Sequence, residues 1–202
     1  ITVEQAQMLG WWYGDGYNVI IKPHGHGRKE PHFAKGFVFN QQEYDYAYPI
    51  VGRAIKSITG VEYVRKLHKG VYEFRTQSPL LEKFFSDLEI ESKDILPVNF
   101  LNQSKEVLIG FIQGIFSADG TVEKDCRRIK LVNKSKALLE QIQLILLQLG
   151  ITSTVRCGRK KGYRGVVYTT DDGTQKVSAD NGSYVLCIHS FSCKLFHQLI
   201  AF

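Results

Sequence analysis

The sequence lacks the features of several large classes of protein. It has no apolar run long enough to cross a bilayer and no signal-like start, so we expect neither a membrane span nor secretion. Its four cysteines, Cys126, Cys157, Cys187 and Cys193, all lie in the second half and form no CxxC pair. We interpret them as free thiols of an intracellular, reducing compartment, which is the cytoplasm, the nucleoid or an organelle matrix. A zinc site built from them is the less favoured alternative.

Length and charge indicate the size of the core and the kind of partner. The chain has 202 residues with 44% hydrophobic content, which is enough for one sizeable core or two smaller ones. Residues 1–100 carry 12 basic and 12 acidic side chains, whereas residues 101–202 carry 14 and 8, so the second half supplies the whole net charge of +6. This excess favours a polyanionic partner held through phosphate contacts. The chain starts at Ile1 rather than at Met, which indicates an excised domain or a trimmed chain.

One pattern occurs twice in the chain. Residues 6–16 read AQMLGWWYGDG, and residues 110–120 read GFIQGIFSADG. In both, small residues recur at every fourth position and are followed by Asp and Gly, so the small residues share one helix face. A face without large side chains lets two helix backbones approach closely. We therefore predict two buried helices that pack against each other, each ending in a left-handed glycine, Gly16 or Gly120.

The aspartate before each of these glycines is unexpected at such a position. Asp15 and Asp119 would lie at helix C-termini, where the helix dipole disfavours negative charge, and at the end of apolar segments, where an unpaired carboxylate is costly. Two such ends side by side would add repulsion between the carboxylates. A divalent cation would offset all three effects, and hard cations prefer oxygen ligands. The matched pair thus favours a metal site over two solvated helix ends.

The two halves repeat the same order of elements. Each motif helix is followed by two segments of strand composition, an amphipathic helix, two further strand segments and a final helix. We expect Pro49 to kink the second helix or delay its start, and Gly60 to end that helix. The predicted strands are 17–22, 33–39, 61–66, 71–76, 121–124, 127–132, 151–157 and 184–189, and the other predicted helices are 43–58, the segment after Ser78, 134–149 and 191–200.

The repeated stretches resemble the paired motifs of the LAGLIDADG homing endonucleases, in the single-chain form with two repeats. The glycines, helix ends and acids match, whereas a position that is often acidic in the family is Tyr13 in one copy and Ser117 in the other. The resemblance implies an α+β fold in which two pseudo-symmetric αββαββα repeats form a β-saddle over a central two-helix interface. Its parts would be an N-terminal repeat at 1–87, a linker at 88–103 and a C-terminal repeat at 104–202.

The resemblance also implies the chemistry. It assigns Asp15 and Asp119 as catalytic metal ligands, with the backbone carbonyls of Gly14 and Ala118 beside them. The reaction would be metal-assisted hydrolysis of one phosphodiester per strand, at a long semi-palindromic site in double-stranded DNA, by a monomer with internal pseudo-two-fold symmetry. Mg²⁺ is the expected ion, with two or three ions bound, and Mn²⁺ is expected to substitute for it.

Members of this family usually carry a further Lys or Gln near each acid. The segment SKDILP at residues 92–97 resembles the lysine-then-proline segment of intein-borne members, which makes Lys93 the best basic candidate. Gln41, just after the second predicted strand, resembles a polar helper position, and Lys134 is its weaker counterpart in the second half. Each of these three side chains could equally be an ordinary surface residue.

A β-surface of this kind can enter the major groove of DNA, and its basic side chains can contact phosphates. The loop that carries His24, His26 and His32 is interpreted as a DNA-facing segment rather than as a metal site. A basic run at 159–164 begins an insertion in the second half and is interpreted in the same way, rather than as a solvated hairpin tip. The predicted DNA-binding residues are Lys22, Arg28, Lys35, Arg65, Lys66, Arg75, Arg127, Arg128, Lys130, Arg156, Arg159, Lys160, Lys161 and Arg164.

Several alternatives stay open from the sequence. The chain shows no starting Cys or Ser and no terminal His-Asn pair, so we expect it to be the endonuclease domain of an intein or a free-standing intron-encoded enzyme, without splicing activity. The main functional alternative is a catalytically silent LAGLIDADG protein that binds DNA, or intron RNA as a maturase. A third interpretation, in which the glycines only pack helices, leaves the matched acids unexplained.

Overall fold

The structure, a computed structural model, describes residues 1–21, 32–62, 66–68, 71–123, 127–162, 166–169, 173–178 and 181–200. It divides the chain into two compact units, Ile1–Gly120 with Phe196–Phe202, and Thr121–Leu195. Both motif helices belong to the first unit, because they pack against each other along their length.

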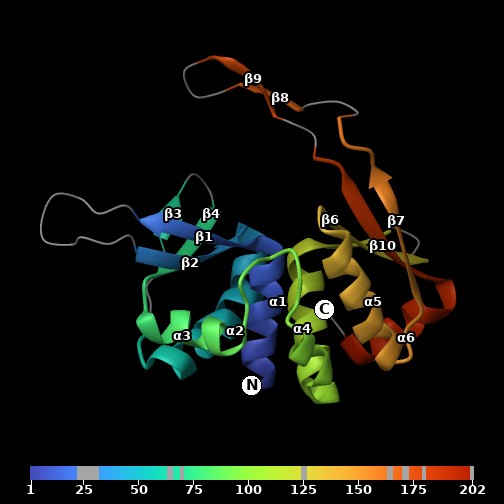
Figure 1. Ribbon diagram of the computed structural model, residues 1–202, viewed down its shortest axis with the longest axis horizontal. Coiled ribbons are helices and arrows are strands. Elements are labelled where there is room, and N and C mark those ends of the chain that lie inside the picture. The colour runs from blue at the N-terminus through green and yellow to red at the C-terminus, as the bar shows by residue number, and fades with distance from the viewer. Residues whose placement is uncertain are drawn as a thin grey trace, which may run out of the picture. The chain divides into compact units, whose positions relative to one another are not determined.

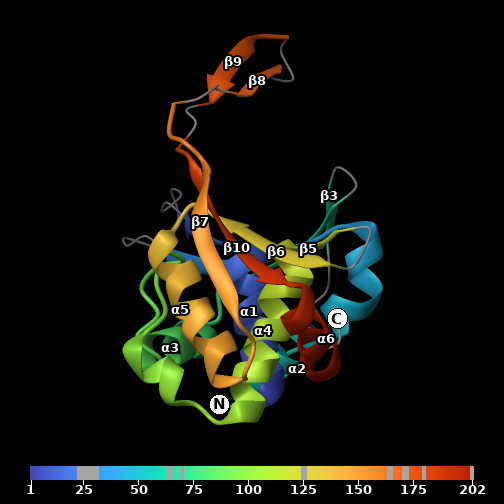
Figure 2. The same ribbon diagram turned by 90° about the vertical axis from the view of Figure 1, so that its right-hand side faces the viewer.

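The first unit combines a four-stranded antiparallel sheet with helices. The sheet has the strand order β1-β2-β4-β3, and helices α1, α2 and α3 lie on one of its faces (Figure 1). Helices α1 and α4 run side by side in both ribbon views (Figures 1 and 2). The elements of this unit are α1 (Val3–Asp15), β1 (Gly16–Ile21), β2 (His32–Phe39), α2 (Gln41–Thr59), β3 (Lys66–His68), β4 (Val71–Thr76), α3 (Pro79–Asp87), the 3₁₀ helix η1 (Val98–Asn102) and α4 (Lys105–Asp119).

Both motif helices pass into a strand without an intervening loop. Helix α1 begins with a capping box between Thr2 and Gln5. It ends at Gly16, where φ is −84°, and α4 ends at Gly120, where φ is −74°. The prediction that Gly16 and Gly120 adopt the left-handed conformation is therefore wrong. The glycines are needed for space instead, because a Cβ at Gly16 would collide with Trp12 and a Cβ at Gly120 would collide with the backbone of Phe116.

Helix α2 starts earlier than the proline alone would suggest. Asn40 caps it through hydrogen bonds from the backbone N–H groups of Gln42 and Glu43 to its side-chain oxygen, at 2.8 and 2.9 Å. Pro49 lies inside the helix, so the alternative of a late start is wrong. Gly60 ends the helix with φ of 72°, as predicted.

Aromatic side chains hold α1 against the sheet and α3. The Trp11 ring stacks on Phe39 at 5.1 Å between ring centroids, and its Nε1–H donates to the Val38 carbonyl at 3.0 Å. The Trp12 ring meets Phe85 of α3 edge-on at 4.8 Å. Because these large side chains point away from the glycine face, α1 can pack closely on α4 at the same time.

The glycine faces of α1 and α4 meet backbone to backbone. A Cβ at Gly10 would lie 2.7 Å from the Ile115 nitrogen and 3.0 Å from the Gly114 Cα. A Cβ at Gly114 would collide with the carbonyl oxygen of Gln7 and would lie 2.9 Å from the Trp11 nitrogen. The prediction of two closely packed, buried motif helices is confirmed, and the missing Cβ atoms are its physical cause.

The second unit repeats the sheet topology of the first. Its four-stranded antiparallel sheet has the order β5-β6-β10-β7, which matches β1-β2-β4-β3 element for element. Helix α5 lies against β6, β7 and β10 (Figure 2). A separate hairpin of β8 and β9 occupies the inserted segment between β7 and β10. The elements are β5 (Gly120–Val122), β6 (Arg128–Asn133), α5 (Lys136–Gln148), β7 (Ser153–Arg159), β8 (Val166–Thr169), β9 (Gln175–Ser178) and β10 (Ser183–His189). Helix α6 (Ser190–Ile200) begins in this unit, and its residues from Phe196 on belong to the first.

The predicted α+β fold class is therefore confirmed, and most predicted elements are found. The first strand of the second half is shorter than predicted, and the helix predicted at 134–149 begins two residues later, after the Ser135 N-cap. The predicted strand 61–66 is partly wrong, because residues 61 and 62 are not in a strand; residues 63–65 lie outside the described residues, and Lys66 begins β3. The saddle and the repeat boundaries at 87 and 104 stay predictions.

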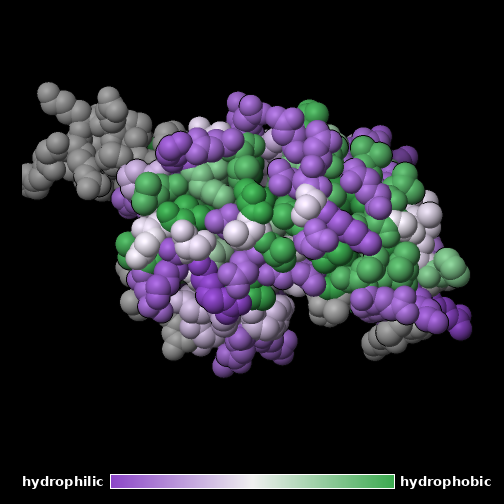
Figure 3. Space-filling model, turned by 90° about the horizontal axis from the view of Figure 1, so that it is seen from below, coloured by the Kyte–Doolittle hydropathy of each residue, from purple (hydrophilic) through white to green (hydrophobic). Residues whose placement is uncertain are grey.

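The surface of the described residues carries both polar and apolar areas. Seen from below, purple polar residues and green apolar residues both cover broad parts of this face (Figure 3). No helix among the described residues has the length and apolarity to cross a membrane. In the same part of the chain Cys157, Cys187 and Cys193 are free thiols, as predicted, whereas Cys126 lies outside it.

Candidate active site

The structure brings the two motif acids together at the ends of their helices. Asp15 is the last residue of α1, and Asp119 is the last residue of α4. Gly14 leaves room for the second carboxylate, because a Cβ there would collide with the Ala118 Cβ and lie 3.4 Å from the Asp119 Oδ2 atom. The glycine stripe thus ends in a narrow space that two carboxylates share.

The electrostatics of the acid pair are unfavourable for two ionised groups. The pKa of Asp15 is raised to about 6, chiefly by burial and then by the negative charges of Asp119 and Glu43, against the opposing effect of Lys93. Burial also raises the pKa of Asp119; Lys93 lowers it and Glu43 raises it. Half-buried carboxylates that repel each other are stabilised by an added cation.

Lys93 comes from the connecting segment between α3 and α4 and reaches the first acid. Its Nζ donates to the carbonyl oxygens of Gly14 and Gly16, each at 2.6 Å. These two carbonyls flank Asp15 in the chain. The position of Lys93 agrees with its predicted role beside the acids, and the role itself stays a prediction.

Tyr13, which stands at a motif position that is often acidic in the family, has a structural role. Its ring is buried, and its hydroxyl donates to the carbonyl oxygen of Ile95 at 3.0 Å. This bond ties the segment that carries Lys93 to α1, two residues beyond the lysine. Burial raises the pKa of the Tyr13 hydroxyl, so it stays protonated as a donor. Tyr13 therefore anchors Lys93 rather than acting as a third acid.

Glu43 is a third carboxylate near the pair, which the sequence interpretation missed. It is the N3 residue of α2, and its Oε2 accepts from the backbone N–H of Asn40 at 2.8 Å. Its charge raises the pKa of both aspartates. The Asn-x-x-Glu capping-box pattern at 40–43 marks the start of α2 in the sequence, but it carries no signal that Glu43 lies near the two acids. Gln41, the predicted helper, is the exposed first residue of the same helix.

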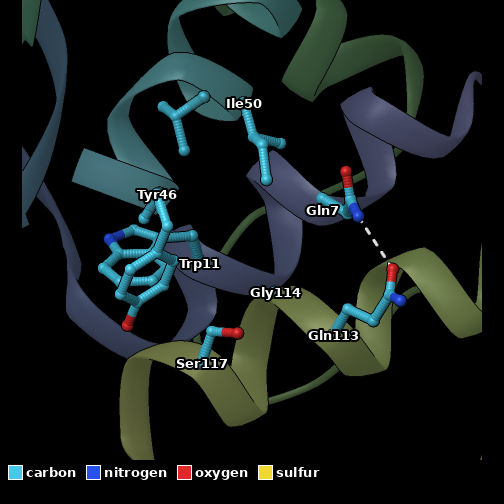
Figure 4. Close-up of a pocket in the computed structure, with 9 residues that line it drawn as sticks. Gln7, Trp11, Tyr46, Ile50, Gln113, Gly114 and Ser117 are labelled. Atoms are coloured by element: carbon cyan, nitrogen blue, oxygen red, sulfur yellow. Dashed lines mark hydrogen bonds between the residues drawn. The ribbon is translucent and has the colours of Figure 1, made fainter. Parts of the chain in front are cut away.

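A small pocket lies close to the acids, between α1, α2 and α4. Tyr46 lies over Trp11, and Ser117 points into the space between the helices (Figure 4). Gln7 Nε2 donates to Gln113 Oε1 at 2.7 Å along its edge, as drawn in Figure 4. The pocket volume of about 40 Å³ leaves room for water but not for a nucleotide. A large substrate would therefore be bound on the open surface and not in this pocket.

The residues at the helix ends fit a divalent metal ion. Two carboxylates supply hard oxygen ligands, and the space left by Gly14 brings them together. The carbonyl of Gly14, predicted as a further ligand, accepts a hydrogen bond from Lys93 here. Groups of three or more His, Cys, Asp or Glu with metal-site geometry are absent among the described residues. The two carboxylates therefore fit an ion that completes its coordination shell with water and substrate oxygens, as Mg²⁺ does.

The register of the first sheet decides which basic residues face away from the helices. Arg75 pairs with Gly36 across β4 and β2, and its side chain is exposed. Lys35 is the residue before Gly36 in β2, so it points to the opposite face of the sheet from Arg75. Arg75 is thus available to DNA on the helix-free face of this sheet.

The prediction that Lys35 binds DNA is wrong, because the side chain is turned into the core. Lys35 is 7% exposed, and its Nζ donates to Asn18 Oδ1 at 2.9 Å. The ammonium lies 3.8 Å from Glu82 Oε2 and above the rings of Trp12 and Phe85, at 5.2 and 4.6 Å from their centroids. Burial lowers the pKa of Lys35, and Glu82 raises it.

Lys35→Met is expected to lower the free energy of unfolding by about 1–3 kcal/mol, because Glu82 loses its cation and its buried Oε1 already lacks a hydrogen-bond partner. Adding Glu82→Gln should recover most of this loss, since replacing both members of a buried pair is often close to neutral. Urea unfolding of the two single variants and the double variant measures the coupling. DNA retention should be unchanged in all of them; a loss of DNA binding in Lys35→Met would contradict the inward placement.

The second sheet carries a basic face of its own. Leu131 and Leu186 are buried toward α5, so their neighbours along each strand point to the other face. Glu123 forms ion pairs with Lys130 and, at 4.0 Å, with Arg128. The basic side chains on this face are Arg128, Lys130 and Arg156.

The other predicted DNA-binding residues fall into three groups. Arg127, Arg159, Lys160 and Lys161 are exposed. Lys66 lies in β3, and Lys22, Arg28, Arg65 and Arg164 lie outside the described residues, as do His24 and His26. Lys134 is an exposed residue of the second unit, between β6 and α5, and its catalytic role stays a prediction.

The pKa of Asp15 predicts a pH-dependent stability. Its unfolded-state pKa is about 4, whereas its folded-state value is about 6. Because the folded protein holds the proton more tightly, the free energy of unfolding should fall as pH rises from about 4 to 6. Urea unfolding across this range in EDTA tests this, and Asp15→Asn should flatten the decline. A free energy of unfolding that rises in this window for the wild type and not for Asp15→Asn would contradict the raised pKa.

Comparison with known proteins agrees with this geometry. The LAGLIDADG-like domain family matches residues 106–200. The homing endonuclease I-DmoI of Desulfurococcus mucosus is 31% identical over 84 residues, which are 42% of this chain and 38% of I-DmoI. The DNA helicase Hel308 of Methanocaldococcus jannaschii is 32% identical over 137 residues, 67% of this chain but 11% of the helicase. The chain spans only 11–18% of the first curated relatives that it matches.

The solved structures resemble the chain over its whole length. A structure of I-DmoI variants gives a TM-score of 0.70 at 21% identity, covering 99% of this chain and 96% of the other. The N-terminal LAGLIDADG domain of WhiA gives 0.55 at 12% identity, covering 100% and 85%. At these identities the likeness concerns the fold, and it confirms the resemblance seen in the motifs. Residues 106–200 are therefore a LAGLIDADG-like domain, and the chain as a whole has the fold of the single-chain LAGLIDADG homing endonuclease I-DmoI.

Proposed function

We propose that the chain is a metal-dependent, site-specific endonuclease that cuts both strands of DNA. The observation that carries this proposal is the meeting of Asp15 and Asp119 at the ends of two helices packed through matched glycines. Two acids placed in this way suit two phosphodiesters related by the approximate dyad of a DNA site. A protein that only bound nucleic acid would have no use for a half-buried pair of mutually repelling carboxylates.

Each residue of the proposed site has a separate role in the reaction. Asp15 and Asp119 would hold the metal and so orient the scissile phosphates, and Lys93 brings a positive charge next to Asp15. A bound divalent ion polarises the phosphate and helps to ionise the attacking water. Raised pKa values of the acids mean that they bind protons in competition with the metal, so activity should increase from mildly acidic to neutral pH.

DNA is bound on the helix-free faces of the two sheets. The exposed basic residues Arg75, Arg128, Arg156 and the half-buried Lys130 supply phosphate or base contacts there. Arginine and lysine on a β-surface can reach the major groove, where base edges are distinguishable. The target is proposed to be long and semi-palindromic because the sheet topology is repeated, and the chain to act as a monomer because one chain carries both acids.

Structures of the related endonuclease support the nature of the ion and the partner. A variant of I-DmoI has been solved with its target DNA in the presence of Mg²⁺, and I-DmoI has been solved with DNA and Ca²⁺ and with DNA and Mn²⁺. We therefore propose Mg²⁺ as the ion, with Mn²⁺ as a substitute. The SKDILP segment at 92–97 supports an intein-type origin, because it resembles intein-borne members and holds the lysine at the site.

The experiment that tests the function is cleavage of a randomised double-stranded DNA library. The protein is incubated with Mg²⁺, with Ca²⁺ or with EDTA, and the cut ends are sequenced. We expect one long sequence to be cut on both strands with Mg²⁺ and not with EDTA. Selective retention of DNA without cutting in any metal would favour the binding protein, and the same library as RNA would then test a maturase.

A further inference from the structure

Lys93, the lysine beside Asp15, donates a hydrogen bond to a carbonyl oxygen that is also a candidate metal ligand. Lys93 Nζ lies 2.6 Å from the carbonyl oxygen of Gly14 and 2.6 Å from that of Gly16. Its charge also acts on both aspartates, Asp15 and Asp119. This ammonium thus partly neutralises the acid pair.

We propose that Lys93 is a built-in counter-ion that competes with the metal ion for the acid pair. The inference rests on the metal site of the proposed function. An ion held by Asp15 and the Gly14 carbonyl would lie within a few ångströms of the ammonium, where two like charges in a half-buried site repel strongly. Binding of the ion therefore requires that the lysine head leaves the Gly14 carbonyl.

The structure allows such a movement without displacement of the main chain. The segment that carries Lys93 is tied to α1 by the Tyr13–Ile95 hydrogen bond at 3.0 Å, two residues beyond the lysine. The head itself is held by two carbonyls and lies 5.9 Å from the centroid of the Trp12 ring, at the limit of a cation–π contact. The anchor and the moving head are thus separate parts of the segment.

The competition would couple metal binding to DNA binding. In the free protein the lysine weakens the binding of the ion. A DNA phosphate adds negative charge at the site, which favours the ion and gives the released ammonium a new charge-assisted partner. By linkage, an ion that binds more tightly with DNA also strengthens DNA binding to the same extent. The metal ion would then occupy the site mainly when the DNA substrate is bound.

Metal-dependent thermal stability tests the competition without any cleavage. Wild-type protein, Lys93→Met and Asp15→Asn are unfolded by heat in EDTA and at increasing Ca²⁺, with no DNA present. Lys93→Met should have a lower midpoint in EDTA than the wild type, since the acids lose their cation. The Ca²⁺ concentration that gives half-maximal stabilisation should be at least about tenfold lower for Lys93→Met than for the wild type. This corresponds to a change of about 1.4 kcal/mol in the free energy of Ca²⁺ binding.

A matched control removes a lysine of the same unit that lies away from the acids. Lys83 is exposed on α3 and is bonded to Asp87 at 2.7 Å, so Lys83→Met changes net charge equally but should leave the Ca²⁺ response unchanged. Equal or weaker Ca²⁺ binding by Lys93→Met than by the wild type, with the response lost in Asp15→Asn, would overturn the competition and leave the metal site intact. An equal response in the wild type and Asp15→Asn would overturn both the metal site and the competition.

A second measurement uses the wild type alone and does not depend on the folding of a variant. The Nζ protons of Lys93, held by two carbonyls, should give a protected ammonium signal in ¹⁵N NMR of the metal-free protein. Addition of Ca²⁺ should remove this protection. A signal that stays protected when Ca²⁺ is saturating would overturn the proposal.

Discussion

Replacing either motif aspartate by asparagine is expected to abolish double-strand cleavage while DNA binding is largely retained. The loss should be at least about a thousandfold, because a catalytic metal supplies several kcal/mol and each 1.36 kcal/mol is a factor of ten in rate. Single-turnover cleavage of the recovered target measures the rate, and retention on the same DNA in EDTA measures binding.

The same variants carry an internal check on folding. Asp15→Asn removes one of two repelling, half-buried carboxylates, so its free energy of unfolding at neutral pH should equal or exceed that of the wild type. An inactive variant that is also unfolded would say nothing about catalysis, and this measurement separates the two cases. Cleavage by Asp15→Asn or Asp119→Asn at the wild-type rate would show that the site assignment is wrong.

Gly114→Ala should cause the largest loss of stability among single conservative changes, about 3 kcal/mol or more. The new Cβ would collide with the carbonyl oxygen of Gln7 and lie 2.9 Å from the Trp11 nitrogen, and both are backbone atoms that cannot rotate away. Helices α1 and α4 would have to separate, which also moves Asp15 and Asp119 apart. Urea unfolding and cleavage should therefore both be affected.

Gly52→Ala is the matched control for this change. Gly52 lies inside α2, and a Cβ there meets nothing within 4 Å. Alanine should increase the free energy of unfolding by about 0.5–1 kcal/mol through its higher helix propensity. If Gly114→Ala were as stable as Gly52→Ala, the close packing of the motif helices would be contradicted.

Much of the fold could be predicted because its signals are local or repeated. The fourfold spacing of small residues fixed the faces of α1 and α4, and the Asp at the end of each copy located the acids. Gly60 ended α2 in the left-handed conformation as expected, because that signal depends on a single residue. The repeated order of strands and helices gave both sheets, whose strand orders match.

Other features depend on contacts between distant residues and could not be predicted. The face of the sheet to which Lys35 points depends on strand register, and a shift by one residue would reverse it. Glu43 approaches the acids only because α2 packs on α1. Gly16 looked like a left-handed helix end, yet its role is to make room for Trp12. The hydrogen bond from Tyr13 to Ile95 joins segments far apart in the chain.

The most direct test of the account is anomalous diffraction from crystals of the protein bound to its recovered target with Mn²⁺. We predict Mn²⁺ density contacting the carboxylates of Asp15 and Asp119 and an oxygen of each scissile phosphate, with Lys93 no longer bonded to the Gly14 carbonyl. Well-ordered DNA with Mn²⁺ bound elsewhere, and with the two aspartates free of metal, would contradict the central claim that these acids form a metal-dependent nuclease site.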